Sequence, residues 1–353
     1  MSLHHLFIGT YTNSGSRGIY ALELDSATGV LSVPRIAAET GNPTYLAFSP
    51  NRRFLYAVNN TPALAIGYAA DIAQARLTPL PLSSTVPEKE PCYVAVDPTA
   101  RAVVVAHYHQ GYLASLPLRP DGSLGAPVSV IRHSGPGTRV VPGRQDKPHV
   151  HCTVISPDGR HVLVCDLGLD RIFYYALDAA SATLTPTSAG SLAVAPGTGP
   201  RHLTFAPNGE HAFLIGELGN TISAYTYDAA SGTLALHDTH PTLPADFRGQ
   251  NTAAAIRVHP NGHFIYGSNR GHDSIAVLAF DAKSGRLTPV EIVPSGGKGP
   301  RDFALSPDGA WLVAAHQESN SLTAFRVDPD TGRLSRVDTS TQLSAPVCVL
   351  FGD

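Results

Sequence analysis

A hairpin-like phrase that occurs six times is the feature that most constrains how this chain can fold. Each copy has a short apolar run, a turn containing Pro followed by Asn, Asp or a variant, and a second apolar run. The turn prolines are 47 to 59 residues apart, at Pro50, Pro98, Pro157, Pro207, Pro260 and Pro307. Two apolar runs joined by a tight turn are typical of a β-hairpin. A repeat of roughly 50 residues with four strands is typical of a β-propeller blade.

The residues between successive hairpins supply the remaining strands. Alternating runs such as SIAVLAFD (274–281) and RLTPVEIV (286–293) follow the hairpins. The chain opens with HLFIGTY, GIYALELD and GVLSVPRI, which are three strands of a blade without its first, and it ends with APVCVLF, which supplies that strand. The sequence therefore predicts an all-β fold: one seven-bladed β-propeller domain over 1–353, with four antiparallel strands per blade. The C-terminal strand should close the ring by joining the N-terminal blade.

Charge and composition exclude several classes of protein. The chain has 25 basic and 28 acidic residues and a formal net charge of −3 without a long block of like charge, so we expect no nucleic-acid partner. The segment MSLHHLFIGTY does not resemble a secretory signal and no apolar run approaches the length of a membrane span, which predicts a cytoplasmic protein without a membrane partner. The four cysteines have no CxxC spacing, which favours reduced buried thiols over a zinc site or a disulfide.

Two sets of positions should converge on one face of the propeller. The first strand of a blade lines the central channel, and antiparallel pairing places its start beside the end of the second strand. The first-strand start positions, six residues before each turn proline, are Thr44, Cys92, His151, Arg201, Ala254 and Arg301. The second strands end near Tyr11, Asn60, His107, Asp166, Glu217, Arg270 and His316. Any one of these residues is typical of an ordinary turn, but the set predicts a polar and charged channel mouth.

The predicted mouth combines acid–base groups with groups that bind anions. Arg201, Arg270 and Arg301 suit carboxylate or phosphate, because a guanidinium donates two parallel hydrogen bonds. The pKa of Glu217 would be lowered by neighbouring arginines or raised by burial, and the sequence leaves the direction open. The segment 131–147 has no counterpart in the other repeats. Long loops of this kind on rigid scaffolds are often functional.

Two His-X-His pairs raise the question of a metal. His107 and His109, and likewise His149 and His151, place two imidazoles on one face of a strand, because side chains alternate with a period of two. No further ligand pattern accompanies either pair, and the sequence has no GxSxG elbow, P-loop or nucleotide fingerprint. We therefore expect neither a metal nor a cofactor.

The chain resembles the seven-bladed propeller lactonases over essentially its whole length. The motifs that carry the resemblance are FIGTYT with GIYALELD, NPTYLAFSP with RFLYAVNN, RQDKPHVH, DLGLDRI, GPRHLTFAP, SNRGHDSIAV, GPRDFALSP and PVCVLF. This group contains bacterial propeller-type 6-phosphogluconolactonases and the fungal carboxy-cis,cis-muconate lactonising enzyme. The resemblance implies that His, Arg and Glu side chains open or form a lactone ring in the channel mouth. By motif, these are His149 or His151 in KPHVH, Arg201 in GPRH, Glu217 in GEL and Arg270 in SNRG.

Three functions are compatible with the sequence. The first is a lactonase that hydrolyses a sugar lactone such as 6-phosphogluconolactone, with the candidate catalytic residues Glu217, His151, His149 and Arg201, and the candidate substrate-binding residues Arg270, Arg301, His107, Asp166 and His316. The second is a cycloisomerase acting on a carboxylated muconate, and the third is a non-catalytic propeller that binds a ligand or a protein. We expect a small lactone or another anionic molecule as the partner, and a monomer or weak homo-oligomer.

Overall fold

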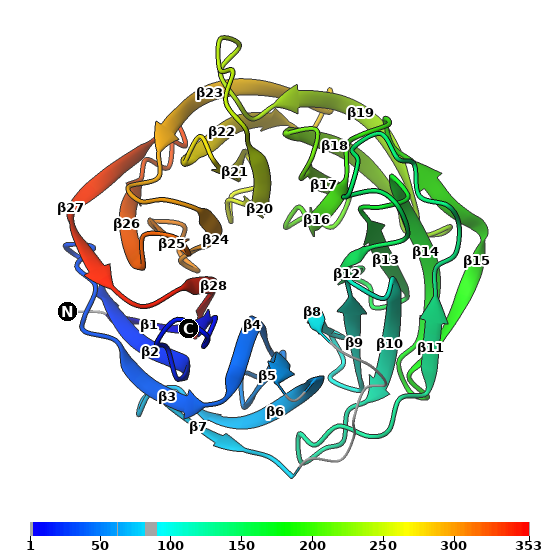
Figure 1. Ribbon diagram of the computed structural model, residues 1–353, viewed down its shortest axis with the longest axis horizontal. Helices are drawn as coiled ribbons and strands as arrows, with labels where there is room; N and C mark the ends of the chain where they lie inside the picture. The colour runs from blue at the N-terminus through cyan, green and yellow to red at the C-terminus, as the bar shows by residue number, and fades with distance from the viewer. Residues whose placement is uncertain (1–2, 62, 82–89, 353) are drawn as a thin grey trace.

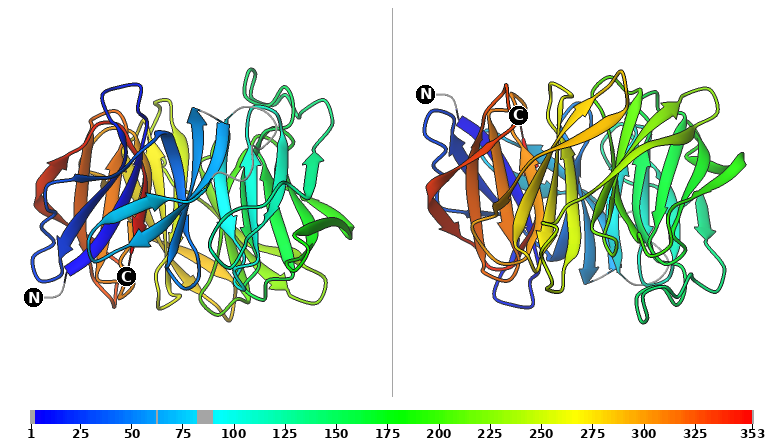
Figure 2. Two further views of the ribbon diagram at one scale, coloured as in Figure 1. Left: turned by 90° about the horizontal axis from the view of Figure 1, so that it is seen from below. Right: turned by 90° about the horizontal axis from the view of Figure 1, so that it is seen from above.

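Seven four-stranded antiparallel sheets form a ring around a central channel (Figure 1). The computed structural model describes residues 3–61, 63–81 and 90–352, and these ranges contain no helix. The first strand of each sheet lies innermost and the fourth outermost (Figure 1). Seen from the side, the molecule is a disc with connecting loops on both faces (Figure 2). The predicted seven-bladed propeller is confirmed.

The blades are numbered here in chain order. Blade 1 contains β28 (Pro346–Phe351), β1 (Leu3–Thr10), β2 (Gly18–Asp25) and β3 (Arg35–Glu39), and blade 2 contains β4 (Gly41–Phe48), β5 (Phe54–Thr61), β6 (Ala63–Asp71) and β7 (Arg76–Pro79). Blade 3 contains β8 (Pro91–Val96), β9 (Ala102–His107), β10 (Tyr112–Pro117) and β11 (Ser129–Arg132), and blade 4 contains β12 (Val150–Ile155), β13 (His161–Asp166), β14 (Arg171–Asp178) and β15 (Thr183–Ala193). Blade 5 contains β16 (Pro200–Phe205), β17 (His211–Gly216), β18 (Thr221–Asp228) and β19 (Thr233–Pro241), and blade 6 contains β20 (Thr252–Val258), β21 (Phe264–Arg270), β22 (Ser274–Asp281) and β23 (Arg286–Pro294). Blade 7 contains β24 (Pro300–Leu305), β25 (Trp311–His316), β26 (Ser321–Val327) and β27 (Leu334–Gln342).

The C-terminal strand closes the ring, as the sequence predicts. Strand β28 pairs antiparallel with β1, with Leu6 opposite Phe351 and Ile8 opposite Val349. This pairing joins the two ends of the chain within one sheet and removes the open edge that β1 would otherwise present.

The predicted hairpin turns are also present. In the turn after β12, the backbone N–H of Gly159 donates to the carbonyl of Ser156 at 2.8 Å, and Gly159 has a φ of 73°. The hydroxyl of Ser156 accepts from the N–H of His161 at 3.0 Å, which ties the turn to the next strand. Such turns fix the register of the two inner strands.

One outer strand differs from the prediction. The run GVLSVPRI (29–36) was expected to form the fourth strand of blade 1, but β3 spans Arg35–Glu39. Leu31 makes only an isolated bridge with Leu24. Pro34 has no N–H to donate to a ladder, so regular pairing begins after it.

The apolar core lies between neighbouring blades rather than at the centre of the disc. Blades 7 and 1 share a cluster that contains Trp311, Leu22 and Phe351. Trp311 is 2% exposed, and its indole N–H donates to the carbonyl of Ser26 at 3.1 Å. Burying a side chain of this size contributes roughly 1.5–3 kcal/mol or more. Because each blade packs against two others, the strand ends around the channel are held in fixed positions.

Candidate active site

A β-bulge re-aims one side chain in the first strand of every blade. The pairing register of the inner strands shifts around the positions 44, 92, 151, 201, 254–255, 301 and 347. A bulge adds one residue to a strand and turns its side chain out of the regular alternation. Six of these positions are the predicted first-strand start positions, and Val347 in β28 is the seventh.

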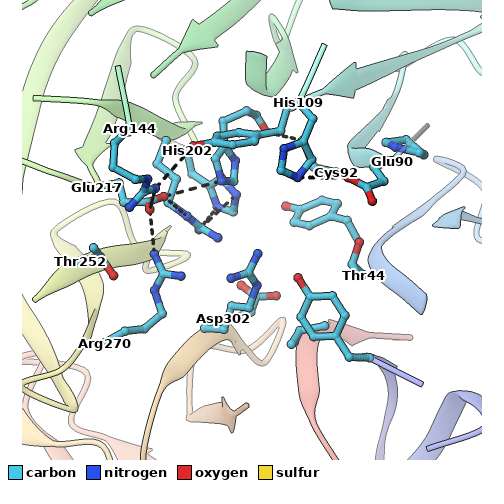
Figure 3. A pocket seen from close by; sticks show the side chains of 18 residues that line it. Thr44, Glu90, Cys92, His109, Arg144, His202, Glu217, Thr252, Arg270 and Asp302 are labelled. Carbon is cyan, nitrogen blue, oxygen red and sulfur yellow. Dashed lines mark hydrogen bonds and ion pairs between the residues drawn. The ribbon is translucent and has the colours of Figure 1, made fainter. Parts of the chain in front are cut away.

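The bulged residues of every blade except blade 6 line a cavity of about 330 Å³ in the channel mouth (Figure 3). The residues that line it are Tyr11, Thr44, Tyr45, Glu90, Pro91, Cys92, Tyr108, His109, Arg144, His151, Arg201, His202, Glu217, Thr252, Arg270, Arg301, Asp302 and Val347. Of the six predicted start positions, only Ala254 does not line the cavity. The side chain of Asn60, a predicted second-strand end, lies outside what the structure describes.

Glu217 is the acidic centre of the cavity and lies among four basic side chains (Figure 3). Its Oε1 lies 2.5 Å from Arg144 Nη2 and 3.3 Å from Arg270 Nη2. Its Oε2 lies 3.0 Å from Arg201 Nε and 3.7 Å from His151 Nε2. Burial opposes ionisation, but the adjacent arginines hold the pKa of Glu217 well below its ordinary value. The sequence leaves open whether the pKa of Glu217 is raised or lowered, and the structure shows that it is lowered.

Arg201 and Arg270 are fixed by backbone carbonyls as well as by Glu217. Arg201 Nη1 donates to the carbonyl of Ala254 at 2.6 Å, and Arg270 Nη2 donates to that of Ala253 at 3.1 Å. Burial, followed by the charge of Arg270, lowers the pKa of Arg201 to about 9. Burial likewise lowers the pKa of Arg270. A pKa of about 9 leaves the Arg201 guanidinium charged at neutral pH.

His151 supplies a neutral imidazole beside this cluster. It is 7% exposed, and burial together with the charge of Arg201 holds its pKa well below the usual 6.5 despite the opposing effect of Glu217. In the described part of the chain, its Nδ1 has no hydrogen-bond partner. The ring of His202 lies 5.4 Å away, edge on, and its pKa is also well lowered by burial and by Arg201. At neutral pH, His151 therefore has a free lone pair.

Arg301 is a cation without an acidic partner among the residues that the structure describes. Its guanidinium lies 5.6 Å from the centre of the Tyr11 ring. Within the described ranges, no carboxylate lies within ion-pair distance of Arg301. Asp302, the next residue, pairs instead with Arg257 at 2.8 Å. Arg301 therefore keeps its hydrogen-bonding capacity for a ligand.

His149 lies next to the cavity without lining it. Its ring stacks on that of Tyr108 at 4.5 Å, its Nδ1 lies 3.1 Å from the Tyr108 carbonyl, and its Nε2 lies 3.6 Å from Asp146. Of the two histidines in KPHVH, only His151 faces the cavity.

Three predicted substrate-binding residues are placed elsewhere by the structure. His107 is fully buried and stacks on Tyr112 at 3.9 Å. Asp166 is fully buried and bonds to backbone and to a histidine outside the cavity. His316 lies 2.9 Å from the carbonyl oxygen of Ser295. None of the three lines the cavity, which corrects their predicted placement.

The cause is a register difference of one residue. His107, Asp166 and His316 pair with the residue that precedes the bulge, at Pro91, Val150 and Pro300. In blade 5 the matching residue is Gly216, and Glu217 comes one position later. Since side chains alternate with a period of two, a shift of one residue turns them to the opposite face.

Arg144 lines the cavity and contacts Glu217, but sequence reasoning missed it. It lies in the segment 131–147, which was noted as irregular, but it occupies no repeated position. The match between repeats therefore gave no signal for it. The available clue was an arginine in a long loop beside the channel mouth.

The described residues show no metal-binding cluster and no membrane-spanning helix. No group of three or more His, Cys, Asp or Glu side chains within these ranges is arranged to hold a metal ion. No helix in the described ranges is long and apolar enough to cross a membrane. The four cysteines are free thiols, with Cys152, Cys165 and Cys348 buried and Cys92 partly exposed.

Comparison with known proteins identifies the family. The family model described as "Lactonase, 7-bladed beta-propeller" matches residues 5–351. The chain belongs to this lactonase family. Members of the family that resemble it include the 6-phosphogluconolactonase of Bacillus subtilis, which is 38% identical over 347 residues, covering 98% of this chain and 97% of the relative.

Solved structures of similar proteins match this lactonase family member over the whole propeller. A periplasmic gluconolactonase from Pseudomonas aeruginosa is 34% identical with a TM-score of 0.92, and the match covers 99% of each chain. A Lactobacillus plantarum protein is 35% identical with a TM-score of 0.92, again over 99% of each chain. The resemblance predicted from the sequence motifs is confirmed.

Proposed function

We propose that this protein hydrolyses a sugar lactone, with 6-phosphogluconolactone and its product 6-phosphogluconate as the leading pair. Membership of the lactonase family supports the reaction class. The similar proteins named as a 6-phosphogluconolactonase and a gluconolactonase support the sugar lactone as substrate. The observation that carries the proposal is one cavity in which a neutral imidazole and several arginines surround an ionised carboxylate.

His151 is the general base in this proposal. An uncharged imidazole can take a proton from water as the water attacks the lactone carbonyl. Glu217, 3.7 Å from His151 Nε2, stabilises the imidazolium that forms. Glu217 itself is the weaker candidate for the base, because its negative charge is held by three arginines and protonation would leave them without a counter-charge.

Arg201 and Arg270 stabilise the oxyanion of the tetrahedral intermediate. Buried, charged donors that are already fixed in place stabilise developing negative charge without reorganising during the reaction. When the intermediate collapses, the bond between the carbonyl carbon and the ring oxygen breaks. The imidazolium of His151 returns its proton to the leaving alkoxide, and the ring opens to a hydroxy acid. His149 stacks on Tyr108, which lines the cavity, and is therefore suited to hold the Tyr108 ring in place.

Cycloisomerisation of a carboxylated muconate is the second candidate. The surplus of arginines in the cavity favours it to the extent that each could bind one substrate carboxylate. It needs one proton to move and no water, so the two reactions can be separated by assay. We infer that hydrolysis is the reaction, because the named relatives are lactonases.

The test is turnover by purified protein and by two variants. Acid release in a pH-stat measures hydrolysis, and ultraviolet absorbance measures consumption of the muconate. We expect hydrolysis, and we expect His151→Asn to lower kcat by about 10²–10⁴-fold, the usual contribution of a general base. Glu217→Gln should also lower kcat, because the imidazolium loses its stabilising charge. Full hydrolysis by His151→Asn would overturn the role given to that residue, and turnover of the muconate alone would overturn the proposed reaction.

The cellular location stays a prediction. We infer a cytoplasmic protein from the sequence, whereas the similar Pseudomonas aeruginosa protein is named as periplasmic. The predicted monomer or weak homo-oligomer is likewise a proposal, which sedimentation of the purified protein would test.

A further inference from the structure

Arg144 is the most exposed of the basic partners of Glu217. Its side chain is 37% exposed, against 16% for Arg270 and 3% for Arg201. Its Nη2 also lies 3.5 Å from the hydroxyl of Tyr108. Arg144 therefore lies toward the opening of the cavity, whereas Arg201 is the most deeply buried of the three arginines.

The cavity carries more positive than negative charge. Three guanidinium groups share the carboxylate of Glu217, and Arg301 has no acidic partner in the described part of the chain. The other cavity carboxylates have partners: Asp302 pairs with Arg257, and Glu90 pairs with a histidine at the rim. Desolvated cations without counter-charge are unfavourable, and an anionic ligand offsets that cost. A phosphate can accept two parallel hydrogen bonds from one guanidinium.

One buried carboxylate ties both ends of the loop that carries Arg144. Asp166 Oδ2 lies 2.7 Å from His133 Nδ1 at the start of the loop, and Asp166 Oδ1 accepts from the backbone N–H of His149 at 2.9 Å at its end. Next to Arg144, Gln145 is fully buried, and its Nε2 donates to a backbone carbonyl at 2.9 Å. A loop fixed at three points loses little freedom when its arginine binds a ligand.

We propose that Arg144 selects lactones with a negatively charged substituent, and that Asp166 is a positioning residue that holds Arg144 through the loop 133–149. The inference rests on the proposed hydrolysis at His151. A lactone whose carbonyl contacts Arg201 extends its substituent toward the opening of the cavity. There, Arg144 exchanges its contact with Glu217 for one with the substituent, while Arg201 and Arg270 keep the charge of Glu217 compensated.

The selectivity is tested with two lactones that differ only in charge at one substituent: 6-phosphoglucono-δ-lactone and glucono-δ-lactone. We expect Arg144→Gln to lower the ratio of kcat/KM for the phosphorylated to the unphosphorylated lactone by about tenfold or more, mainly through KM, since a hydrogen bond between two charged groups is lost. Arg139→Gln is the matched control. It removes one positive charge from the same loop, but its side chain is exposed and does not line the cavity, so the ratio should not change.

The positioning role is tested with Gly168→Ala. A Cβ at Gly168 would overlap the carbonyl oxygen of Lys147 and displace the loop close to Arg144. We expect this variant to lower the ratio as Arg144→Gln does, and the double variant to be no worse than the more impaired single variant, since both changes remove the same contact. Asp166→Asn is measured in the same comparison and tests Asp166 itself, because its amide oxygen can still accept from the N–H of His149 while the contact with His133 loses its charge. An unchanged ratio in this variant would overturn the role of Asp166.

Each result separates this inference from the proposed function. If the wild-type protein hydrolyses neither lactone, the proposed function is wrong. If it hydrolyses both and Arg144→Gln lowers both kcat/KM values equally, selection by Arg144 is overturned while the hydrolysis stands. If the losses in the double variant add, the positioning role of the loop is overturned.

Discussion

At the scale of single residues, the site depends on the opposite effects of two neighbours on one imidazole. Arg201 lowers the pKa of His151 in addition to the effect of burial, whereas Glu217 raises it. The net effect keeps the imidazole neutral and able to accept a proton. In the proposed mechanism, Glu217 stabilises the imidazolium that forms when His151 accepts a proton, and Arg201 stabilises the oxyanion.

This balance predicts how pH affects kcat/KM. A base is active when it is unprotonated, so activity should fall as the pH drops through the pKa of His151, well below 6.5. Glu217→Gln should move this acid limb to lower pH, because a charge that raises the pKa is removed. Arg201→Gln should move it to higher pH. The measurement is kcat/KM against pH on glucono-δ-lactone, with Arg139→Gln as a control that leaves the limb in place. A limb that moves in the same direction in both variants would contradict the assignment of His151 as the base.

At the scale of strands and turns, the repeat determines which site residues can be predicted from sequence. Counting back from the turn proline finds Arg201 and His151, because the bulge in each of blades 4 and 5 lies six residues before that proline. The same approach fails for Asp166, because the bulge adds one residue to the first strand and the matching position in the second strand is one residue later. Arg144 belongs to a loop that only one blade has, so its position depends on tertiary contacts such as those of Gln145.

The turns offer a matched comparison at this scale, since residues 156–159 and 306–309 both read Ser-Pro-Asp-Gly. Gly159 and Gly309 have φ values of 73° and 75°, so alanine at either position should cost about 1–2 kcal/mol of unfolding free energy. A Cβ at Gly159 meets only Pro98 at 3.7 Å, whereas one at Gly309 would lie 2.5 Å from His259 Nε2. Gly309→Ala should therefore cost at least about 1 kcal/mol more than Gly159→Ala, as overpacked sites do. Urea denaturation measures the difference, and equal losses would show that the His259 ring moves aside freely.

At the scale of the whole molecule, closing the ring buries polar groups as well as apolar ones. Because the seven blades pack tightly around the channel, many inward-facing side chains have little contact with water. Several of these side chains are histidines. Burial lowers the pKa of His151, His202 and His316 below the ordinary 6.5. These residues are neutral in the folded protein but accept protons when the chain unfolds in mild acid. The expected activity near neutral pH and the expected sensitivity to acid therefore have the same cause.

The expected consequence is that stability falls as the pH drops below about 6.5. In that range the unfolded state binds more protons than the folded state, so the free energy of unfolding decreases with falling pH, by up to about 1.4 kcal/mol per pH unit for each such histidine, until the folded pKa is reached. Thermal unfolding between pH 8 and pH 5 should show a plateau above 7 and a falling midpoint below 6.5. His316→Asn, whose Nδ2 takes the place of the ring Nδ1 and can donate to the carbonyl of Ser321, should make the fall shallower by the contribution of one proton. A midpoint that is constant down to pH 5, or a slope that His316→Asn leaves unchanged, would mean that these histidines are protonated in the folded state. The assignment of His151 as a neutral base would then lose its main support.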